Sequence, residues 1–104
     1  LRVIGRRDRL IVTGGEKVDP AEVEQKLLKL EGIEQALVRG EPDAEWGEAV
    51  VAYLQTDGRP LSSAALRKQL SRFLVSYKLP RKFYQVDSFP PDLNDVASYV
   101  RIGS

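Results

Sequence analysis

The sequence predicts an α+β domain in which a small N-terminal β-hairpin and a three-stranded mixed sheet pack against helices. Two segments begin with helix-capping residues and carry an apolar stripe at helical spacing. Between them, residues 49–54 are almost continuously apolar, which is typical of a central strand covered on both faces. The predicted order along the chain is hairpin, helix, strand, strand, helix, strand.

The hairpin is expected near the N-terminus. Residues 2–7 and 9–13 are two short β-capable runs that would pair, or bend, around Asp8. Gly14 and Gly15 follow, and glycine permits φ values that are closed to other residues, so a turn is expected there.

The first helix is predicted to begin at Pro20 and to end at Gly32. Asp19 suits the N-cap, Pro20 suits the first helical position, and Glu22 stands where a capping box places its acid. The expected buried face consists of Val23, Leu27 and Leu30.

The rest of the chain supplies three strands and a second helix. Strands are predicted over residues 33–39, 49–54 and 82–86, and the first of them should be broken by residues 40–43. The second helix is predicted over 63–75, with Ser62 as its N-cap. Its expected buried stripe consists of Leu66, Leu70, Phe73 and Leu74.

Composition excludes several classes of function. With 104 residues, the chain is long enough for one domain. Its 16 basic and 15 acidic residues give a net charge of +1, which argues against a nucleic-acid platform or an acidic-membrane binder. No apolar run approaches a membrane span and no signal peptide is recognisable. Without cysteine or histidine, no disulfide or metal site is expected, and a cytoplasmic location fits.

Residues 5–24 contain a motif with many fixed spacings. Its anchors are Gly5, Arg6, Asp8, Ile11, Gly14, Gly15, Glu16, Pro20, Glu22, Val23 and Glu24. The motif resembles the hinge signature of adenylate-forming enzymes, the superfamily of acyl-coenzyme A synthetases, firefly luciferase and peptide-synthetase adenylation domains. Its Ile-Val-Thr-Gly-Gly-Glu form resembles ligases acting on aryl or small acids, 2-succinylbenzoate ligases included.

Three later segments extend the resemblance to nearly the whole chain. They are Pro42-Asp43 followed by Gly47-Glu48, the run from Tyr77 to Arg81, and Phe89-Pro90. In the family, such a domain is the mobile C-terminal part of a larger enzyme. That enzyme activates a carboxylate with ATP and Mg and transfers the acyl group to coenzyme A.

The resemblance implies that residues 1–104 are a single C-terminal domain excised from such an enzyme. Its partner would be the missing N-terminal adenylation domain, and the chain alone should not catalyse anything. The absence of any methionine, including at position 1, fits an excised piece.

The resemblance makes Asp8, with Arg6, the hinge about which the domain rotates between two half-reactions. A short polar residue at a strand break can change φ and ψ without losing buried contacts. On turn preferences alone, Asp8 would be an ordinary hairpin-turn aspartate.

A coenzyme-binding role is implied for seven residues, which are Gly14, Gly15, Glu16, Trp46, Tyr77, Lys78 and Arg81. The glycines would border the pantetheine tunnel, or they could simply form a turn. Trp46 stands in a loop and could contact ligand, although a lone tryptophan is more often part of a core. Cations among these residues could neutralise coenzyme phosphates or could merely be solvated at a helix end.

The end of the chain departs from the family pattern. A catalytic lysine is expected about six residues after the proline of the last motif, and here that position, counted from Pro90, is Val96. Valine cannot stabilise developing negative charge. Either adenylation chemistry has been lost, leaving a ligand- or protein-binding module, or the residues after Pro91 are altered or foreign.

Overall fold

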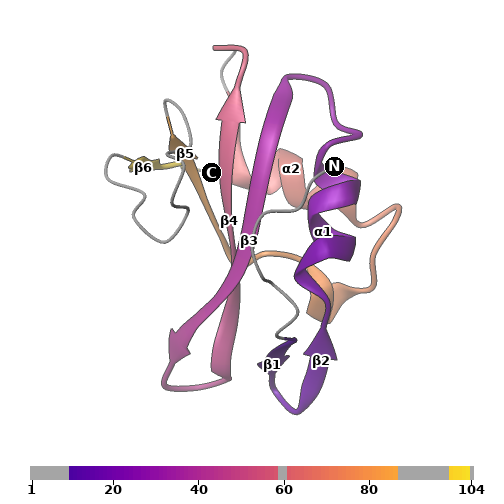
Figure 1. Ribbon diagram of the computed structural model, residues 1–104, viewed down its shortest axis with the longest axis vertical. Helices are drawn as coiled ribbons and strands as arrows, with labels where there is room; N and C mark the ends of the chain where they lie inside the picture. Colours follow the sequence, from indigo (N-terminus) through magenta and orange to yellow (C-terminus); the bar gives the residue numbers. More distant parts are fainter. Residues whose placement is uncertain (1–9, 59–60, 87–98, 104) are drawn as a thin grey trace.

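The computed structural model describes residues 10–58, 61–86 and 99–103, and it confirms the α+β class. Within these residues, three pairs of consecutive strands are separated by two α-helices (Figure 1). The elements are β1 (Ile11–Thr13), β2 (Glu16–Val18), α1 (Pro20–Leu27), β3 (Ile33–Asp43), β4 (Gly47–Thr56), α2 (Ser63–Leu70), a 3₁₀ turn η1 (Ser76–Lys78), β5 (Lys82–Val86) and β6 (Tyr99–Arg101).

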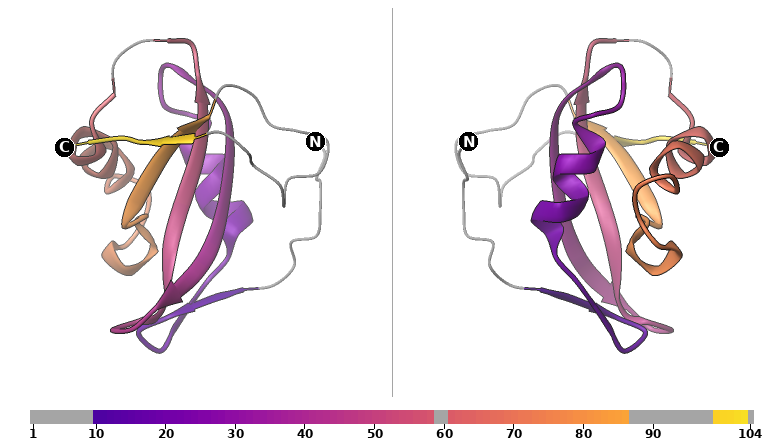
Figure 2. Two further views of the ribbon diagram at one scale, coloured as in Figure 1. Left: turned by 90° about the vertical axis from the view of Figure 1, so that its left-hand side faces the viewer. Right: turned by 90° about the vertical axis from the view of Figure 1, so that its right-hand side faces the viewer.

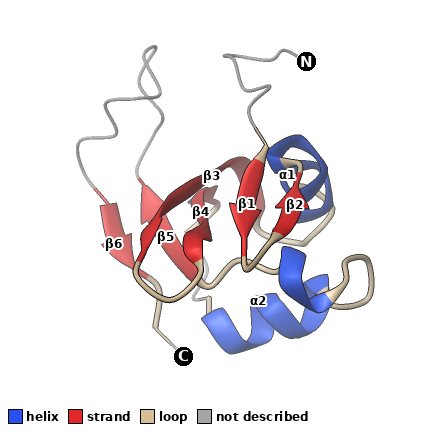
Figure 3. Cartoon of the chain, turned by 90° about the horizontal axis from the view of Figure 1, so that it is seen from below, coloured by secondary structure: helices blue, strands red, loops and turns tan. Residues whose placement is uncertain are grey.

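All six strands belong to one mixed sheet, which is larger than the three-stranded sheet expected. Its order is β2-β1-β4-β5-β6, and β3 pairs with β4 as well. The β4–β5 pair is parallel and the other pairs are antiparallel. Figure 3 shows the β1–β2 hairpin and β6 at opposite sides of the sheet. The apolar run 49–54 lies inside β4, which is the central strand, as predicted.

The described hairpin is formed by β1 and β2 around Gly14 and Gly15. Both glycines have positive φ, +59° and +85°, which confirms the predicted turn. The pairing expected for residues 2–7 lies outside the described residues. At the sheet, β1 is joined to β4 by the single pair Thr13↔Gly47.

The break predicted at residues 40–43 is wrong, because β3 continues to Asp43 and pairs with β4 throughout. Gly40 does not end the strand. A Cβ there would lie 2.9 Å from Cγ2 of Ile11, so the glycine lets the hairpin pack closely across β3. Among the strands that the structure describes, β3 pairs only with β4, and an edge strand tolerates a proline because its outward N–H is not needed for pairing.

Both helices begin where their capping residues predict. The Asp19 carboxylate accepts from the Ala21 amide, and the Ser62 hydroxyl accepts from the Ala65 amide. The helices are shorter than expected, since α1 ends at Leu27 rather than near Gly32, and α2 ends at Leu70 rather than 75.

The early end of α2 corrects one predicted core residue. Directly after the helix, the Ser71 hydroxyl donates to the Lys68 carbonyl at 2.6 Å, a local bond that competes with regular helix. The chain turns there, so Leu74 is buried while Phe73 is 46% exposed. Phe73 is therefore not part of the buried stripe.

Two apolar clusters hold the sheet. Val50, Ala52 and Leu54 of β4 belong to the main cluster, in which both helices also take part. Figures 1 and 2 show α1 and α2 on the same side of β3 and β4. Alternate β4 residues Val51 and Tyr53 belong to a smaller cluster, because successive strand side chains point to opposite faces. Burial and a hydrogen bond to a carboxylate raise the pKa of Tyr53 to about 12.

Two glutamates of the sequence motifs accept hydrogen bonds from strand backbone. Glu24 of α1 accepts from the backbone amide of Val38 at 2.8 Å, which covers the free edge of β3. Glu48 of β4 accepts from the Val12 amide at 2.9 Å and so supplements the single backbone pair that joins β1 to the sheet.

Candidate functional site

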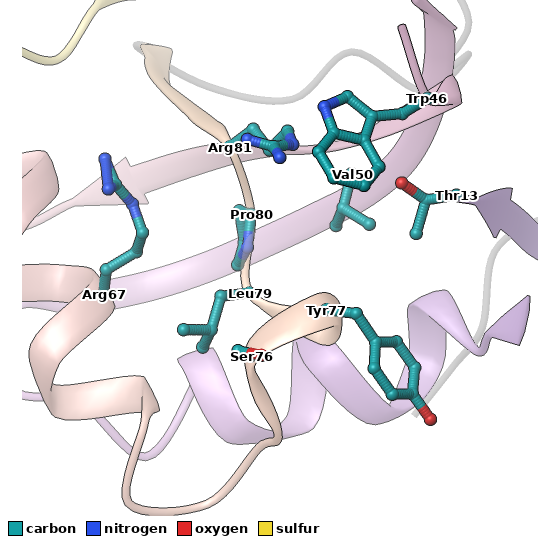
Figure 4. Close-up of a pocket in the computed structure, with 9 residues that line it drawn as sticks. All are labelled: Thr13, Trp46, Val50, Arg67, Ser76, Tyr77, Leu79, Pro80 and Arg81. Atoms are coloured by element: carbon teal, nitrogen blue, oxygen red, sulfur yellow. The ribbon is translucent and has the colours of Figure 1, made fainter. Parts of the chain in front are cut away.

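A pocket of roughly 400 Å³ opens where the hairpin, the loop before β4, α2 and the segment before β5 meet. Its lining residues are Thr13, Trp46, Val50, Arg67, Ser76, Tyr77, Leu79, Pro80 and Arg81. Figure 4 shows Arg67 rising from α2 on one side and Trp46 with Thr13 on the other, with Pro80 and Arg81 between them. Three of the residues predicted from the sequence, Trp46, Tyr77 and Arg81, thus share one pocket.

The loop that carries Trp46 is held by Asp43. One carboxylate oxygen of Asp43 accepts from the amides of Glu45 and Trp46, at 2.8 Å and 2.9 Å. The Trp46 amide and then the Glu45 amide hold the pKa of Asp43 below its usual range, and nearby positive charge on Arg81 acts in the same direction. This is an Asx turn, which explains why an aspartate stands at this position.

Trp46 is fixed from two further sides. Its carbonyl accepts from the Gly14 amide at 2.9 Å. A Cβ on Gly14 would lie 2.7 Å from Cε3 of the indole, so glycine is required there for contact with the ring. On the other side, the Arg81 guanidinium lies over the indole, 4.4 Å from the ring centroid, as a cation–π contact. Trp46 nevertheless remains 37% exposed, so part of its side chain faces the pocket.

The remaining predicted ligand residues are placed differently. The Lys78 ammonium donates to the Glu22 carboxylate of α1 at 2.8 Å, and this bond raises the pKa of Lys78. It therefore ties η1 to α1, and Lys78 does not line the pocket. Gly15 and Glu16 are exposed at the hairpin tip, next to the pocket but outside its lining. Asp8, Arg6 and Val96 lie outside the described residues.

Sequence reasoning missed Arg67, Thr13 and Ser76, which also line the pocket. Arg67 lies between the buried positions Leu66 and Leu70 of α2, and its sequence position alone predicts a solvent-exposed helix residue. Nothing in its local pattern shows that β5 crosses beside the helix, because the parallel β4–β5 pairing that brings them together is a tertiary feature.

The pocket suits an anionic ligand with a flat or slender part. None of its nine lining residues carries a carboxylate, whereas two carry guanidinium groups. Trp46 and Tyr77 add aromatic surface, and Thr13 and Ser76 add hydroxyls. Within the described residues, no group of three or more metal-ligating side chains comes together, and neither helix is long and apolar enough to cross a bilayer.

Comparison with known proteins places this arrangement in a family. The AMP-binding enzyme C-terminal domain family matches residues 22–93. Among curated proteins, the 2-succinylbenzoate–CoA ligase of Enterococcus faecalis is 44% identical over 90 residues, which is 86% of this chain and 18% of the ligase. The Bacillus subtilis enzyme of the same name is 40% identical over 90 residues, again 86% of this chain and 18% of the relative. The chain thus spans about a fifth of the length of these relatives.

Solved structures agree with the sequence comparison. A double mutant of o-succinylbenzoate CoA synthetase from Bacillus subtilis, bound to its product analogue OSB-NCoA, superposes with a TM-score of 0.84 at 34% identity, over 95% of this chain and 22% of that one. A fatty acyl CoA synthetase from Mycobacterium tuberculosis gives 0.74 at 33% identity, over 78% and 16%. From its sequence and its fold alike, the chain belongs to the AMP-binding enzyme C-terminal domain family.

Proposed function

We propose that this chain is the mobile C-terminal cap of an ATP-dependent acyl-coenzyme A ligase that acts in the cytoplasm. Residues 1–104 would be one domain, joined through a hinge at Asp8 and Arg6 to an N-terminal adenylation domain. The N-terminal domain would hold ATP, Mg and the acid, and the cap would close over it and receive coenzyme A. By itself the chain would be inactive.

The pocket beside the glycine turn carries this proposal. The family resemblance predicts Trp46, Tyr77 and Arg81 as coenzyme contacts, and these three residues line one pocket that has two guanidinium groups and no carboxylate. A coenzyme combines phosphates with a slender apolar arm, and arginine forks with aromatic walls suit those two parts. The Gly14 turn stands at the rim, where its backbone packs on Trp46.

The relatives support the same reading. Their names describe CoA ligases and synthetases, and one solved relative, MatB from Rhodopseudomonas palustris, was determined with ATP bound and matches with a TM-score of 0.76 at 34% identity. In this arrangement the cap would contact the thiol of the coenzyme, and the N-terminal domain would contact the acid.

Val96 favours a second candidate function. With valine at the position expected for the catalytic lysine, the domain could be a non-catalytic module that binds a ligand or a protein. The two candidates differ in one respect, which is whether this domain accelerates transfer of an acyl group from its adenylate to coenzyme A.

A domain exchange tests this difference. The C-terminal domain of the Bacillus subtilis 2-succinylbenzoate–CoA ligase is replaced by this chain, and the two half-reactions are measured separately. We expect thioester formation from preformed acyl-adenylate, but little adenylation, because the lysine is absent. The controls are the intact Bacillus enzyme and its N-terminal domain alone. A chimera that transfers no faster than the N-terminal domain alone would favour the binding module.

The hinge is tested in the same chimera. Proline fixes φ near roughly −65°, so Asp8→Pro should hold the cap in one orientation. The rate of one half-reaction should then fall far more than the rate of the other. Thioester formation is the step that should be lost if the orientation that proline holds is the adenylating one. Equal effects on both half-reactions would remove Asp8 from the hinge role.

A further inference from the structure

The β1–β2 hairpin is joined to the rest of the sheet by few backbone hydrogen bonds. Among the described residues, β1 pairs with β4 only at Thr13↔Gly47. The Gly14 amide, next along the chain, donates to the Trp46 carbonyl at 2.9 Å. Both contacts lie beside the glycine turn, so they hold the tip of the hairpin to the sheet. They fix a point of attachment, whereas the direction of the strand requires a further contact along its length.

Glu48 supplies that further contact from β4. Its Oε1 accepts from the Val12 amide at 2.9 Å, one residue before the backbone pair of β1 with β4. The carboxyl group lies against Gly40 of β3, where a Cβ would lie 3.2 Å from Cδ of Glu48 and 3.3 Å from its Oε1. The same Cβ would lie 2.9 Å from Cγ2 of Ile11, so one glycine leaves room for both the carboxylate and the hairpin.

Apolar burial and hydrogen bonding contribute differently to the attachment of the hairpin. Ile11 and Val18 are 1% and 0% exposed and belong to the main cluster, so their burial stabilises the attachment. Burial is non-directional, whereas a hydrogen bond to a carboxylate requires the donor and the acceptor to meet at a set distance and angle. The angle at which β1 lies on the sheet therefore depends on Glu48 more than the attachment itself does.

We infer that Glu48 is a positioning residue for thioester formation, because its carboxylate sets the angle of the hairpin and thereby the place of the Gly14–Gly15 turn when the cap receives coenzyme A. The inference rests on the proposed function and gives Glu48 a role that the family resemblance does not assign. In this step the thiol sulfur bonds to the acyl carbon, the bond from that carbon to the phosphate oxygen of AMP breaks, and the thiol proton leaves to water. A displaced turn should slow this step.

The attachment is measured in the 104-residue chain, by amide hydrogen exchange at Val12. The variants are Glu48→Ala, Glu48→Gln and, as a matched control, Glu34→Ala at an exposed glutamate of β3. In Glu48→Ala the Val12 amide should exchange about tenfold or more faster, since a hydrogen bond to a charged group contributes that much to an equilibrium. Glutamine keeps an acceptor oxygen without the charge, so Glu48→Gln should be intermediate. Glu34→Ala should match the original chain.

Transfer is measured in the chimera with the Bacillus N-terminal domain, in single turnovers of bound acyl-adenylate at saturating coenzyme A. For Glu48→Ala the rate constant should fall about tenfold or more, because a small displacement of a positioning group has a large effect on rate. The amplitude, which counts the enzyme molecules able to react, should stay complete. Glu48→Gln should recover the rate constant and the Val12 protection together, and Glu34→Ala should leave both unchanged.

Three results would overturn the inference and leave the proposed function standing. A lowered amplitude with an unchanged rate constant would show that Glu48 only keeps the domain folded. An unchanged rate constant despite faster exchange at Val12 would show that the hairpin angle does not affect transfer. Unchanged exchange at Val12 would show that Glu48 does not hold the hairpin. If Glu48→Ala does not fold, Glu48→Gln is judged by the same three criteria. An original chimera that transfers nothing would instead contradict the proposed function, and with it the role of Glu48 in transfer.

Discussion

At the scale of single residues, Gly14 and Arg81 both contact Trp46, which lines the pocket. A Cβ on Gly14 would lie 2.7 Å from Cε3 of the indole, and the Arg81 guanidinium lies over the same ring system. The glycine pair therefore has two separate roles. Gly15 provides a backbone conformation at the hairpin tip, whereas Gly14 provides both a conformation and the space that the tryptophan occupies.

Alanine substitution separates these roles. Both glycines have positive φ, so Gly14→Ala and Gly15→Ala should each cost about 1–2 kcal/mol in backbone strain. Only at position 14 would the new methyl group meet the indole, since nothing lies within 4 Å of a Cβ at position 15. Gly14→Ala should therefore be the less stable variant and should shift the emission of Trp46. Denaturant titration with fluorescence detection measures both effects, and identical emission from the two variants would contradict the proposed contact.

The conformation of Trp46 also depends on one carboxylate. Since Asp43 accepts two amides of the loop, its pKa is lowered in the folded chain. A lowered folded-state pKa means that this contribution to stability is present above the unfolded-state pKa and is lost as the pH falls through the folded-state value. The loop should accordingly loosen only in acid.

We expect the Trp46 emission of the native chain to titrate below about pH 4, the ordinary range of an aspartate. Asp43→Asn keeps an oxygen acceptor but cannot titrate, so its emission should resemble the native one at neutral pH and lack the acid transition. Asp43→Ala should show the loosened loop at every pH. An acid transition that persists in Asp43→Asn would assign it to another group.

At the scale of elements, the sequence predicted the starts of the helices better than their ends. Asp19 and Ser62 cap as expected because an N-cap is a local bond between a side chain and nearby amides. The end of α2 depends on Ser71 and on where β5 must begin, and the length of β3 depends on its partner. Residues 40–43 look like a turn in isolation, yet they pair with β4 through Asp43↔Gly47.

The residues of the candidate site also differ in whether local sequence or tertiary structure places them there. Trp46, Tyr77 and Arg81 were predictable because they stand in motifs of fixed spacing. Arg67 was not predictable, because the crossover from β4 through α2 to β5 brings it to the pocket. Lys78 stands in a motif as well, but its ammonium is bonded to Glu22, a contact over 56 positions of sequence that no local pattern contains.

At the scale of the whole molecule, one cluster links nearly every element. It joins the hairpin through Ile11, α1 through Leu27, β4 through Leu54, α2 through Leu70 and β5 through Phe83. Because the elements share this core, the 104-residue chain should unfold as one cooperative unit.

Leu54 tests that cooperativity, since it is fully buried at the centre of the cluster. Leu54→Ala should lower the free energy of unfolding by about 2–5 kcal/mol. Leu28→Ala, at a position that is 49% exposed, is the matched control and should change it by less than about 0.5 kcal/mol. Far-ultraviolet circular dichroism and Trp46 fluorescence should give the same transition in each variant. Separate transitions would show that the hairpin side of the domain unfolds on its own.

Under the proposed function, adenylation by the full enzyme would depend on the residues after Pro91, of which position 96 lies outside the described residues. The family resemblance places a lysine six residues after Pro90, where this chain has Val96. In the chimera with the Bacillus N-terminal domain, Val96→Lys should restore adenylation. A lysine ammonium there would contact the carboxylate and the α-phosphate as negative charge develops, and such a contact acts in the transition state.

Three tails decide whether that register is correct: the present one, Val96→Lys, and one carrying the complete family motif after Pro90. Recovery by Val96→Lys alone, to within about tenfold of the complete motif, would mean that a single missing charge separates this domain from an active cap. If only the complete motif restores acyl-adenylate formation, position 96 is not equivalent to the family lysine. A third outcome is that no tail restores acyl-adenylate formation while thioester transfer persists. Persistent transfer would mean that the thioester-forming orientation is intact. The defect would then lie in how this cap contacts the N-terminal domain in the adenylating orientation.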